Sequence, residues 1–523
     1  MSATMDADIL LAYFGKEHTK IINVPGRMYR VDVFYLRNAV DDYIEAAIQT
    51  AFQLLLWATS KKKESDMLVF LPGQEEISIF CAGLQKRLES ILEKTKKDNF
   101  LILPLYAALP RAEQEKIFVK TSKIKVIGAT TIAETSITIP GIRYIIDPGL
   151  VKCRRFCGQT GLESLEITSA SRAQSEQRRG RAGREAPGFC YRLYPESQFE
   201  QLLERRPPDI QQTELSSVVL RLLALGISRP QDFDYLTKPP RSALLRALET
   251  LYALQALDAQ GSLTQKGQLL AELPLAPLFG NLILLAREEQ YSSIADPLLA
   301  LVATLSANDD ARSFFLHSSS NNNAFADPGS DLLTDLNVFL TFLKEVNTND
   351  FCHANGLRRS ALQAARYAYQ QLRAIDKKHQ RTIIPATLDY DRDLLLNCLV
   401  AGLATVQTAI RDHQKRIYTT LRGQHQVFLH PSSILHARNP PPDALVFASC
   451  VSTNKRYIRG LSAFSPDRLP DLVPHLYISS SSLVVMPGGK KQLQHHKISP
   501  QKKRPKAVMF NHLPISASSS GAW

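Results

Sequence analysis

The chain lacks a hydrophobic run long enough to cross a membrane. Its best apolar stretch, Ile294–Ala307, is shorter than the roughly 20 residues that a transmembrane helix needs, and it contains Asp296. The N-terminus also lacks a basic segment followed by an apolar one, which is the pattern of a secretory signal. We therefore expect no membrane-spanning segment.

Cysteine is sparse and scattered. The seven cysteines form no CxxC pair, so the sequence predicts reduced thiols in a cytosolic or nuclear protein. Cys153 and Cys157 could contribute two metal ligands, but no second pair at ligand spacing accompanies them. Ordinary half-buried thiols are the favoured interpretation, and no metal site is expected.

Positive charge is in excess. The 523 residues carry a formal net charge of +13 at an ordinary apolar fraction of 44%, and the isoelectric point is near 9.3. Such a balance favours a polyanionic partner, either nucleic acid or an anionic membrane surface. The length allows about three to four domains.

Between about Asp66 and Tyr194, short β-rich runs alternate with helical stretches. This alternation predicts a parallel α/β sheet covered by helices. Between Gly149 and Thr168, two β-rich runs flank CGQTG and predict an inserted hairpin, made basic by Lys152, Arg154 and Arg155. The predicted sheet strands are Met67–Leu71, Phe100–Tyr106, Ile124–Ala129, Ile142–Asp147 and Phe189–Tyr194.

The rest of the chain changes character after Pro207-Pro208. Two helical runs and a β-wing turn at Leu257–Gly267 suggest a winged helix, and the chain is mainly helical from about Phe279 to Ile375. The polar stretch His317–Asp331 is expected to be a mobile loop. Short strands from about Val400 to Leu476 predict a small β-barrel, and the remainder is expected to be disordered.

The strongest chemical signal is QRRGRAGR, Gln177–Arg184. On a continuous helix, Gln177, Arg181 and Arg184 would share one face, and Gly180 and Gly183 would let a partner approach closely. Two guanidiniums and an amide that converge on one spot suit a phosphate whose charge grows during transfer. A basic surface helix or an RGG-like RNA patch is the alternative.

The second signal follows the predicted strand Ile124–Ala129. Thr131 and Glu134 have the spacing of a capping box, and the helix start would present free N–H groups beside the Thr130, Thr131 and Ser136 hydroxyls. Such a helix start suits backbone phosphates. Glu134 could instead be a catalytic acid, but capping explains it without chemistry.

Together these two stretches resemble motifs V and VI of the DEAH-box (superfamily-two) RNA helicases. The resemblance continues through nearly the whole chain. The further matching stretches are Met67–Ile77 (motif IV), Leu103–Phe118, Ile210–Gly226, His430–Ser433 and Thr453–Arg459. It implies an α/β RecA-like lobe with a parallel sheet and a β-hairpin insertion, followed by a winged helix, a helical ratchet domain and an OB-like β-barrel. The implied boundaries are a first-lobe remnant and linker in 1–27, the second lobe in 28–205, the winged helix in 206–275, the ratchet domain in 276–390, the barrel in 391–477, and a basic tail in 478–523.

The resemblance also implies roles for single residues. Arg181 and Arg184 would be arginine fingers on the γ-phosphate of ATP, with Gln177 positioning the phosphate or the attacking water, while Arg178 braces the motif. Phe118 would stack on the adenine, although a core phenylalanine is the alternative for this residue. Thr130, Thr131 and Ser136 would contact RNA. The basic hairpin, with Lys152, Arg154 and Arg155, would be a wedge against RNA.

The first residues resemble motif III of the same family, carried here by Ser2, Ala3 and Thr4. This likeness implies that Met1 is an internal methionine and that the first RecA-like lobe is absent. The sequence contains neither GxxxxGK[ST] nor DEAH, the motifs by which that lobe would hold ATP with Mg²⁺. We therefore expect an ATP-dependent helicase by family, moving RNA in the 3′ to 5′ direction, whose chain alone is inactive. A non-catalytic RNA-binding or regulatory fragment is the alternative.

The expected partners are RNA and, by resemblance, a G-patch-type activator. Lys490-Lys491 and Lys502–Lys506 are spaced like a bipartite nuclear localisation signal. This predicts a nuclear protein, in the nucleoplasm or the nucleolus, with the cytoplasm as the alternative. A solvated basic tail that adds RNA affinity is the other interpretation of the same residues.

Overall fold

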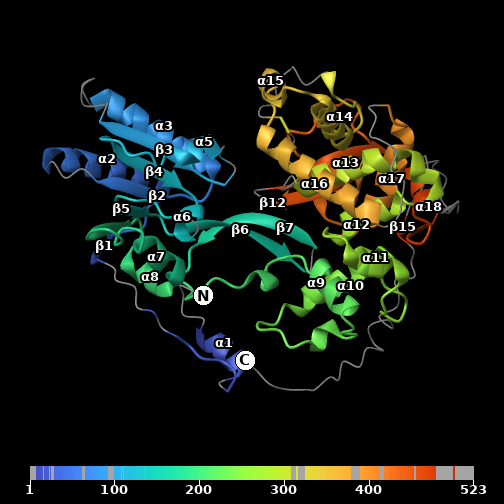
Figure 1. Ribbon diagram of the computed structural model, residues 1–523, viewed down its shortest axis with the longest axis horizontal. Helices are drawn as coiled ribbons and strands as arrows, with labels where there is room; N and C mark the ends of the chain where they lie inside the picture. The colour runs from blue at the N-terminus through green and yellow to red at the C-terminus, as the bar shows by residue number, and fades with distance from the viewer. Residues whose placement is uncertain are drawn as a thin grey trace, which may run out of the picture. The chain divides into compact units, whose positions relative to one another are not determined.

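A computed structural model describes most of the chain. The described residues are 7–15, 17–22, 24, 29–61, 65–91, 99–107, 109, 111–135, 137–158, 161–307, 314–315, 324–378, 389–412, 417–452, 455–478 and 499–500. The chain divides into two compact units (Figure 1). The first unit comprises Met1–Arg154 and Leu165–Asp209, and the second comprises Arg155–Ser164 and Ile210–Trp523.

The first unit is built on a parallel sheet of six strands in the order β1-β8-β5-β2-β4-β3. The pairings between neighbouring strands are all parallel. Its strands are β1 (Val31–Tyr35), β2 (Asp66–Phe70), β3 (Phe100–Leu105), β4 (Ile124–Ala129), β5 (Ile142–Asp147) and β8 (Gly188–Arg192). The predicted parallel α/β sheet is confirmed.

Apolar side chains pack on both faces of this sheet. Each strand contributes to both, because its successive side chains point to opposite sides. In β2, Met67 and Val69 pack with helices α2 (Tyr43–Lys61) and α3 (Gln74–Ile91). Leu68 and Phe70, the intervening residues, join a second cluster on the other face. This arrangement explains why β2 is apolar without a break from Met67 to Phe70.

Further short helices belong to the first unit. They are α5 (Arg111–Glu115), α6 (Ile132–Thr135), α7 (Arg172–Arg179) and α8 (Glu196–Gln201). The N-terminal helix α1 (Ala7–Phe14) has no buried residue, and its Phe14 is 57% exposed.

The predicted hairpin is confirmed as β6 (Leu150–Cys157) and β7 (Leu162–Ser169), which are neighbours in a second sheet. Its base belongs to the first unit and its tip, Arg155–Ser164, to the second. The hairpin is therefore the part of the chain that both units share.

The second unit opens with a winged helix, as predicted. Its helices are α9 (Ser216–Ala224), α10 (Arg241–Ala253) and α11 (Gln265–Glu272), with a 3-10 turn at Pro230–Asp232. The wing is closed by an antiparallel bridge between Leu257 and Leu263. Gly261 lies in its turn at φ +82°, a conformation that favours glycine.

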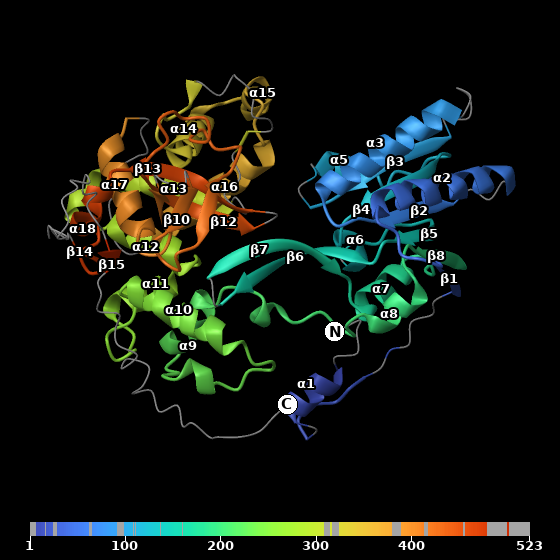
Figure 2. The ribbon, with the colours of Figure 1, turned by 180° about the vertical axis from the view of Figure 1, so that it is seen from behind.

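The following region is helical around the deeply buried α13 (Ala295–Ala307). Every residue of α13 from Asp296 to Leu305 is buried. The surrounding helices are α12 (Pro277–Leu285), α14 (Asp331–Lys344), α15 (Thr348–Ala354), α16 (Arg359–Lys378) and α17 (Arg392–Leu403), with a 3-10 helix at Glu289–Ile294. Figure 2 shows these helices from behind.

A closed five-stranded barrel follows, in the order β13-β11-β10-β9-β12 with β12 also paired to β13. Its strands are β9 (Thr408–Asp412), β10 (Ile417–Thr420), β11 (Gln426–Leu429), β12 (Ala444–Ser452) and β13 (Arg456–Phe464). Beyond it lie α18 (Leu469–Leu472) and the short pair β14 (Tyr477–Ile478) and β15 (Ser499–Pro500). The predicted barrel is confirmed.

The expectation of a mobile loop was wrong for the last part of His317–Asp331. Asp327 is 7% exposed and accepts hydrogen bonds from Arg392, and Ser330 is fully buried. The Ser330 hydroxyl caps α14 by accepting from the Leu333 N–H, at 3.1 Å. The polar residues here serve capping and ion pairing, which composition alone does not distinguish from a solvated loop.

Within the described residues, no single helix is long and apolar enough to span a membrane. The bent pair α11 and α12 reaches the required length and composition only when its two helices are taken together.

Candidate functional site

The QRRGRAGR stretch is half helix and half turn. Helix α7 begins after the capping box of Ser171 and Gln174, and it ends at Arg179 with Gly180 as its C-cap. Arg181 and Arg184 therefore lie in the turn that follows. The prediction that they share a helix face with Gln177 was wrong, because the helix stops before reaching them.

Arg181 and Arg184 nevertheless converge on one short segment of the first unit. Arg181 Nη1 donates to the Ile137 carbonyl at 3.1 Å, and Arg184 Nη1 donates to the Thr138 hydroxyl at 2.5 Å. Burial, together with the neighbouring charge of Arg184, lowers the pKa of Arg181 to about 10. An anion placed against these two adjacent guanidiniums would offset the penalty on the Arg181 charge.

The second glycine of the motif has a different role from the predicted one. A Cβ at Gly183 would lie 2.7 Å from the Tyr29 carbonyl oxygen and 2.8 Å from Val31 Cγ2. The Tyr29 N–H also donates to the Gly183 carbonyl at 2.8 Å. Gly183 thus admits the protein's own chain at the start of β1, and not an external partner.

Arg178 is the buried member of the motif. It is 1% exposed and donates to Glu134 Oε1 at 2.7 Å, to Asp147 Oδ1 at 2.6 Å and to the Leu150 carbonyl at 3.1 Å. Its guanidinium also lies over the Phe70 ring, 4.9 Å from the centroid. Burial alone would lower the pKa of Arg178, but the two carboxylates outweigh that effect and raise it. The predicted bracing role is confirmed.

The role of Glu134 differs from the predicted one, which was to cap a helix. Its carboxylate is 5% exposed and accepts from Arg178 and from Gln174 Nε2. Helix α6 is only one turn long, with Thr131 exposed and Thr130 half-buried before it. Ser136 lies outside the described residues. The RNA contacts of Thr130, Thr131 and Ser136 stay predictions.

The two remaining residues predicted to contact ATP, Phe118 and Gln177, differ in exposure. Phe118 is 44% exposed, while the neighbouring Ile117 is fully buried, so the core-phenylalanine alternative was wrong. Gln177 is half-buried on α7. Stacking of Phe118 on an adenine and positioning of a phosphate by Gln177 stay predictions.

The three basic residues of β6 are not equivalent. Arg154 and Arg155 are exposed, whereas Lys152 is half-buried. A Cβ at Gly73 would lie 3.4 Å from Lys152 Nζ, so this lysine packs along the backbone that precedes α3. The predicted motif III residues Ser2, Ala3 and Thr4 lie outside the described residues.

Metal ligands do not gather at the cysteines. Cys153 is buried and Cys157 is exposed, and within the described ranges no group of three or more His, Cys, Asp or Glu side chains could hold an ion.

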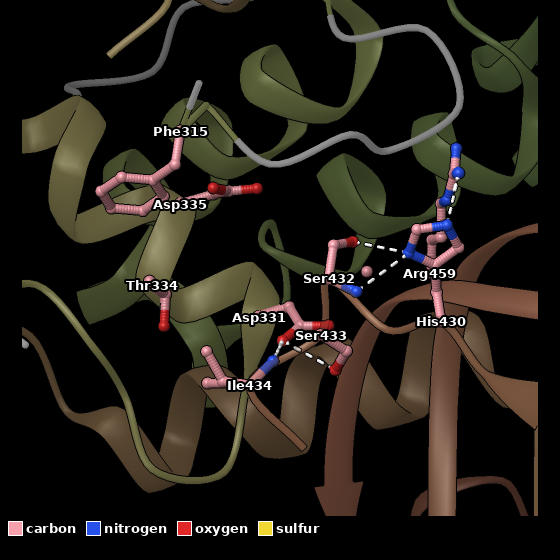
Figure 3. A pocket seen from close by; sticks show the side chains of 10 residues that line it. Phe315, Asp331, Thr334, Asp335, His430, Ser432, Ser433, Ile434 and Arg459 are labelled. Carbon is pink, nitrogen blue, oxygen red and sulfur yellow. Dashed lines mark hydrogen bonds between the residues drawn. The ribbon is translucent and has the colours of Figure 1, made fainter. Parts of the chain in front are cut away.

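A polar pocket in the second unit brings together residues that the sequence argument quoted only as a family match. His430 Nδ1 accepts from the Ser432 N–H at 3.1 Å, and His430 Nε2 lies 2.7 Å from Arg459 Nη2 (Figure 3). In the same pocket, Asp331 accepts from the Ser433 hydroxyl and the Ile434 N–H. The sequence pattern could not predict this convergence, because Asp331, His430 and Arg459 are far apart in the sequence and the HPSS stretch is an irregular loop.

The buried pairing of Arg178 yields a stability prediction. We expect Arg178→Met to lower the free energy of unfolding of the first unit by about 3–5 kcal/mol, because Asp147 and Glu134 would remain buried without a counter-charge. Arg179→Met is the matched control on the same helix. Arg179 is 38% exposed and pairs with Glu176 at the surface, so its loss should cost about 1 kcal/mol or less. Urea unfolding measures both, and equal losses would contradict the prediction.

Comparisons with known proteins agree with this architecture. Three family profiles match the chain: "Helicase conserved C-terminal domain" over residues 46–186, "Helicase associated domain (HA2), winged-helix" over 247–275, and "Oligonucleotide/oligosaccharide-binding (OB)-fold" over 395–477.

The chain is also similar to curated proteins along most of its length. The chain is 34% identical over 498 residues to the human "Probable ATP-dependent RNA helicase DHX35", covering 92% of this chain and 69% of that protein. It is 36% identical over 497 residues to "Pre-mRNA-splicing factor ATP-dependent RNA helicase DEAH10" of Arabidopsis thaliana, covering 91% and 67%. It is 34% identical over 479 residues to "Pre-mRNA-splicing factor ATP-dependent RNA helicase prp22" of Schizosaccharomyces pombe, covering 91% and 40%. With the parallel sheet, the winged helix and the barrel in the same order, the chain belongs to the DEAH-box family of ATP-dependent RNA helicases and corresponds to their C-terminal portion.

Proposed function

We propose that this chain supplies the arginine-finger and RNA-binding half of an ATP-driven RNA helicase. The observation that carries the proposal is the convergence of Arg181 and Arg184 on Ile137–Thr138, beside the buried Arg178. Burial, together with the neighbouring charge of Arg184, lowers the Arg181 pKa to about 10, and two such adjacent guanidiniums fit the terminal phosphate of ATP. When bound, ATP with Mg²⁺ supplies the phosphoryl group whose hydrolysis drives the cycle.

Each site residue then has a distinct task. The two guanidiniums hold the terminal phosphate and stabilise negative charge there, and Gln177 orients the phosphate or a water. Phe118 offers an exposed ring for the adenine. The hairpin and the Thr130–Thr131 turn contact RNA, and ATP-linked movement of the lobes carries the strand in the 3′ to 5′ direction.

The sequence given contains no GxxxxGK[ST] and no DEAH motif, so we propose that the chain by itself does not turn over ATP. An arginine finger contributes about 10³–10⁵ in rate, but only to a nucleotide that other groups already hold. Purified chain mixed with ATP, Mg²⁺ and poly-uridine RNA should release phosphate no faster than an Arg181→Ala/Arg184→Ala control. RNA-stimulated hydrolysis at rates typical of a helicase would contradict this.

A second candidate function is RNA binding without catalysis, and the exposed Arg154 and Arg155 favour it. We predict that Arg154→Glu/Arg155→Glu weakens binding to single-stranded RNA and flattens its salt dependence. Each lost phosphate contact should reduce the slope of log K against log salt by about 0.7.

The matched control for that pair is Lys120→Glu/Lys123→Glu. Both lysines are exposed and come just before the N-terminal end of β4. The hairpin instead follows the C-terminal end of β5, and in a parallel sheet these two strand ends lie on opposite sides. Fluorescence anisotropy with a labelled oligonucleotide at several salt concentrations measures both variants. Unchanged affinity and slope in the arginine variant would remove the hairpin from the RNA site.

We also propose a nuclear location and a G-patch-type activator as a partner. Two of the similar proteins are named as pre-mRNA-splicing factors, which supports a nuclear role. Lys490-Lys491 and Lys502–Lys506, which lie outside the described residues, would be the signal.

The signal can be tested apart from the helicase. Gly488–Lys506 fused to a fluorescent reporter too large to diffuse through nuclear pores should move it into the nucleus, because a receptor-read address is transferable. The same segment with its seven lysine and arginine positions changed to alanine is the control. A parent fusion that stays in the cytoplasm would leave the segment as an RNA-affinity element.

A further inference from the structure

The tip of the β6–β7 hairpin is anchored in the second unit and does not stand free. The Phe156 ring packs against the apolar cluster of the winged helix, whose members include Ala243 and Ala247 of α10. The Phe156 N–H donates to the Gln212 carbonyl at 2.7 Å, ahead of α9. The end of the wedge expected from the family resemblance is therefore fixed within the second unit.

Two glycines allow the backbone of the tip to lie directly against α10. A Cβ at Gly158 would be 2.5 Å from the Ala243 nitrogen and 2.7 Å from the Ser242 carbonyl carbon. These are backbone atoms at the start of a helix, so they cannot move aside as a side chain could. Gly161 has φ +70°, and a Cβ there would be 2.3 Å from Arg246 Nε. Any larger residue at position 158 must displace the tip.

The barrel contacts the same hairpin tip through β7, the second strand of the hairpin. Ser164 of β7 pairs with Ser452 of β12, so the hairpin extends the barrel sheet. The Ser164 hydroxyl donates to the Arg155 carbonyl at 3.2 Å, which ties the two hairpin strands together at the basic residue. The backbone of Arg155 is thereby held between the winged helix and the barrel.

The basic residues lie on the outer strand of this arrangement. β6 is the last strand in the order β13-β11-β10-β9-β12-β7-β6. Because neighbouring side chains of a strand point to opposite faces, the exposed Arg154 and Arg155 flank its outer edge from two sides. An extended polyanion lying along this edge would meet both guanidiniums at a fixed separation.

We propose that Phe156 and Gly158 form a latch that positions Arg154 and Arg155 for the RNA backbone. The inference rests on the proposed RNA binding and adds its positioning residues, which carry no charge themselves. A hairpin held in its binding geometry loses less conformational freedom when RNA binds than a loose one does. Opening the latch should therefore weaken RNA binding although every basic residue remains.

The test compares the full chain with Gly158→Ala and Phe156→Ala, using a labelled oligo-uridine in anisotropy titrations across a potassium chloride series. Gly128→Ala in β4 is the matched control, because a Cβ there would make only ordinary contacts at 3.4 Å with Ile77 and Phe80. Circular dichroism checks that each variant is folded. The rate of tryptic cleavage after Arg154 and Arg155 reports whether the hairpin has come loose.

We expect both latch variants to bind RNA about fivefold to tenfold more weakly, which is about 1.0–1.4 kcal/mol. Their salt slope should fall less than that of Arg154→Glu/Arg155→Glu, and tryptic cleavage of the hairpin should be faster. If Gly158→Ala does not fold, Phe156→Ala decides the question. Affinities within a factor of two of the parent in the folded latch variants would overturn the positioning role, even with faster cleavage. A parent chain without salt-dependent RNA binding would instead overturn the proposed RNA function, and this inference with it.

Discussion

The buried ion cluster of Arg178 with Glu134 and Asp147 is the interaction on which the site of the first unit depends. It joins four segments: helix α7, the single turn α6, the end of β5 and, through the Leu150 carbonyl, the first residue of the hairpin. An arginine that is 1% exposed is tolerated only when carboxylates neutralise it. The segments must therefore come together as a set, and the turn that carries Arg181 and Arg184 is placed by the same contacts.

This cluster also separates two electrostatic roles within one short motif. Arg178 is surrounded by negative charge, so it is bound internally and has no capacity for an external anion. Arg181 and Arg184 donate to a carbonyl and a hydroxyl, which carry no formal charge. The carboxylates outweigh burial and raise the pKa of Arg178, whereas burial and the neighbouring Arg184 lower the pKa of Arg181. Three of the four arginines in Arg178–Arg184 thus supply one brace and one anion site.

The parts of the fold that were predictable from sequence are those set by local patterns. Strand β2 is apolar from Met67 to Phe70, where side chains on both its faces are buried, and the wing has its glycine because the turn needs a positive φ. The errors arose where a distant residue decides the outcome. Glu134 has the spacing of a cap, but its carboxylate is taken by Arg178, 44 positions away. Helix α7 ends at Arg179 with Gly180 as its C-cap, and the contacts of Arg181 and Arg184 with Ile137 and Thr138 are again with distant residues that no local periodicity reveals.

The roles of two glycines, Gly183 in the basic motif and Gly158 in the hairpin, are also decided by residues distant in the sequence. In a sequence, a glycine in a basic motif suggests space for a ligand, and Gly183 was interpreted in that way. Its missing side chain instead admits Tyr29 of the same chain, and Gly158 likewise admits the backbone of α10. Both positions bring two backbone segments closer than any side chain would allow. Gly183 lies next to Arg184, and Gly158 lies three residues after Arg155. Close backbone packing is thus what holds these guanidiniums in place, at the turn after α7 and on the hairpin. Binding strength at both sites should then depend on uncharged residues as much as on the arginines themselves.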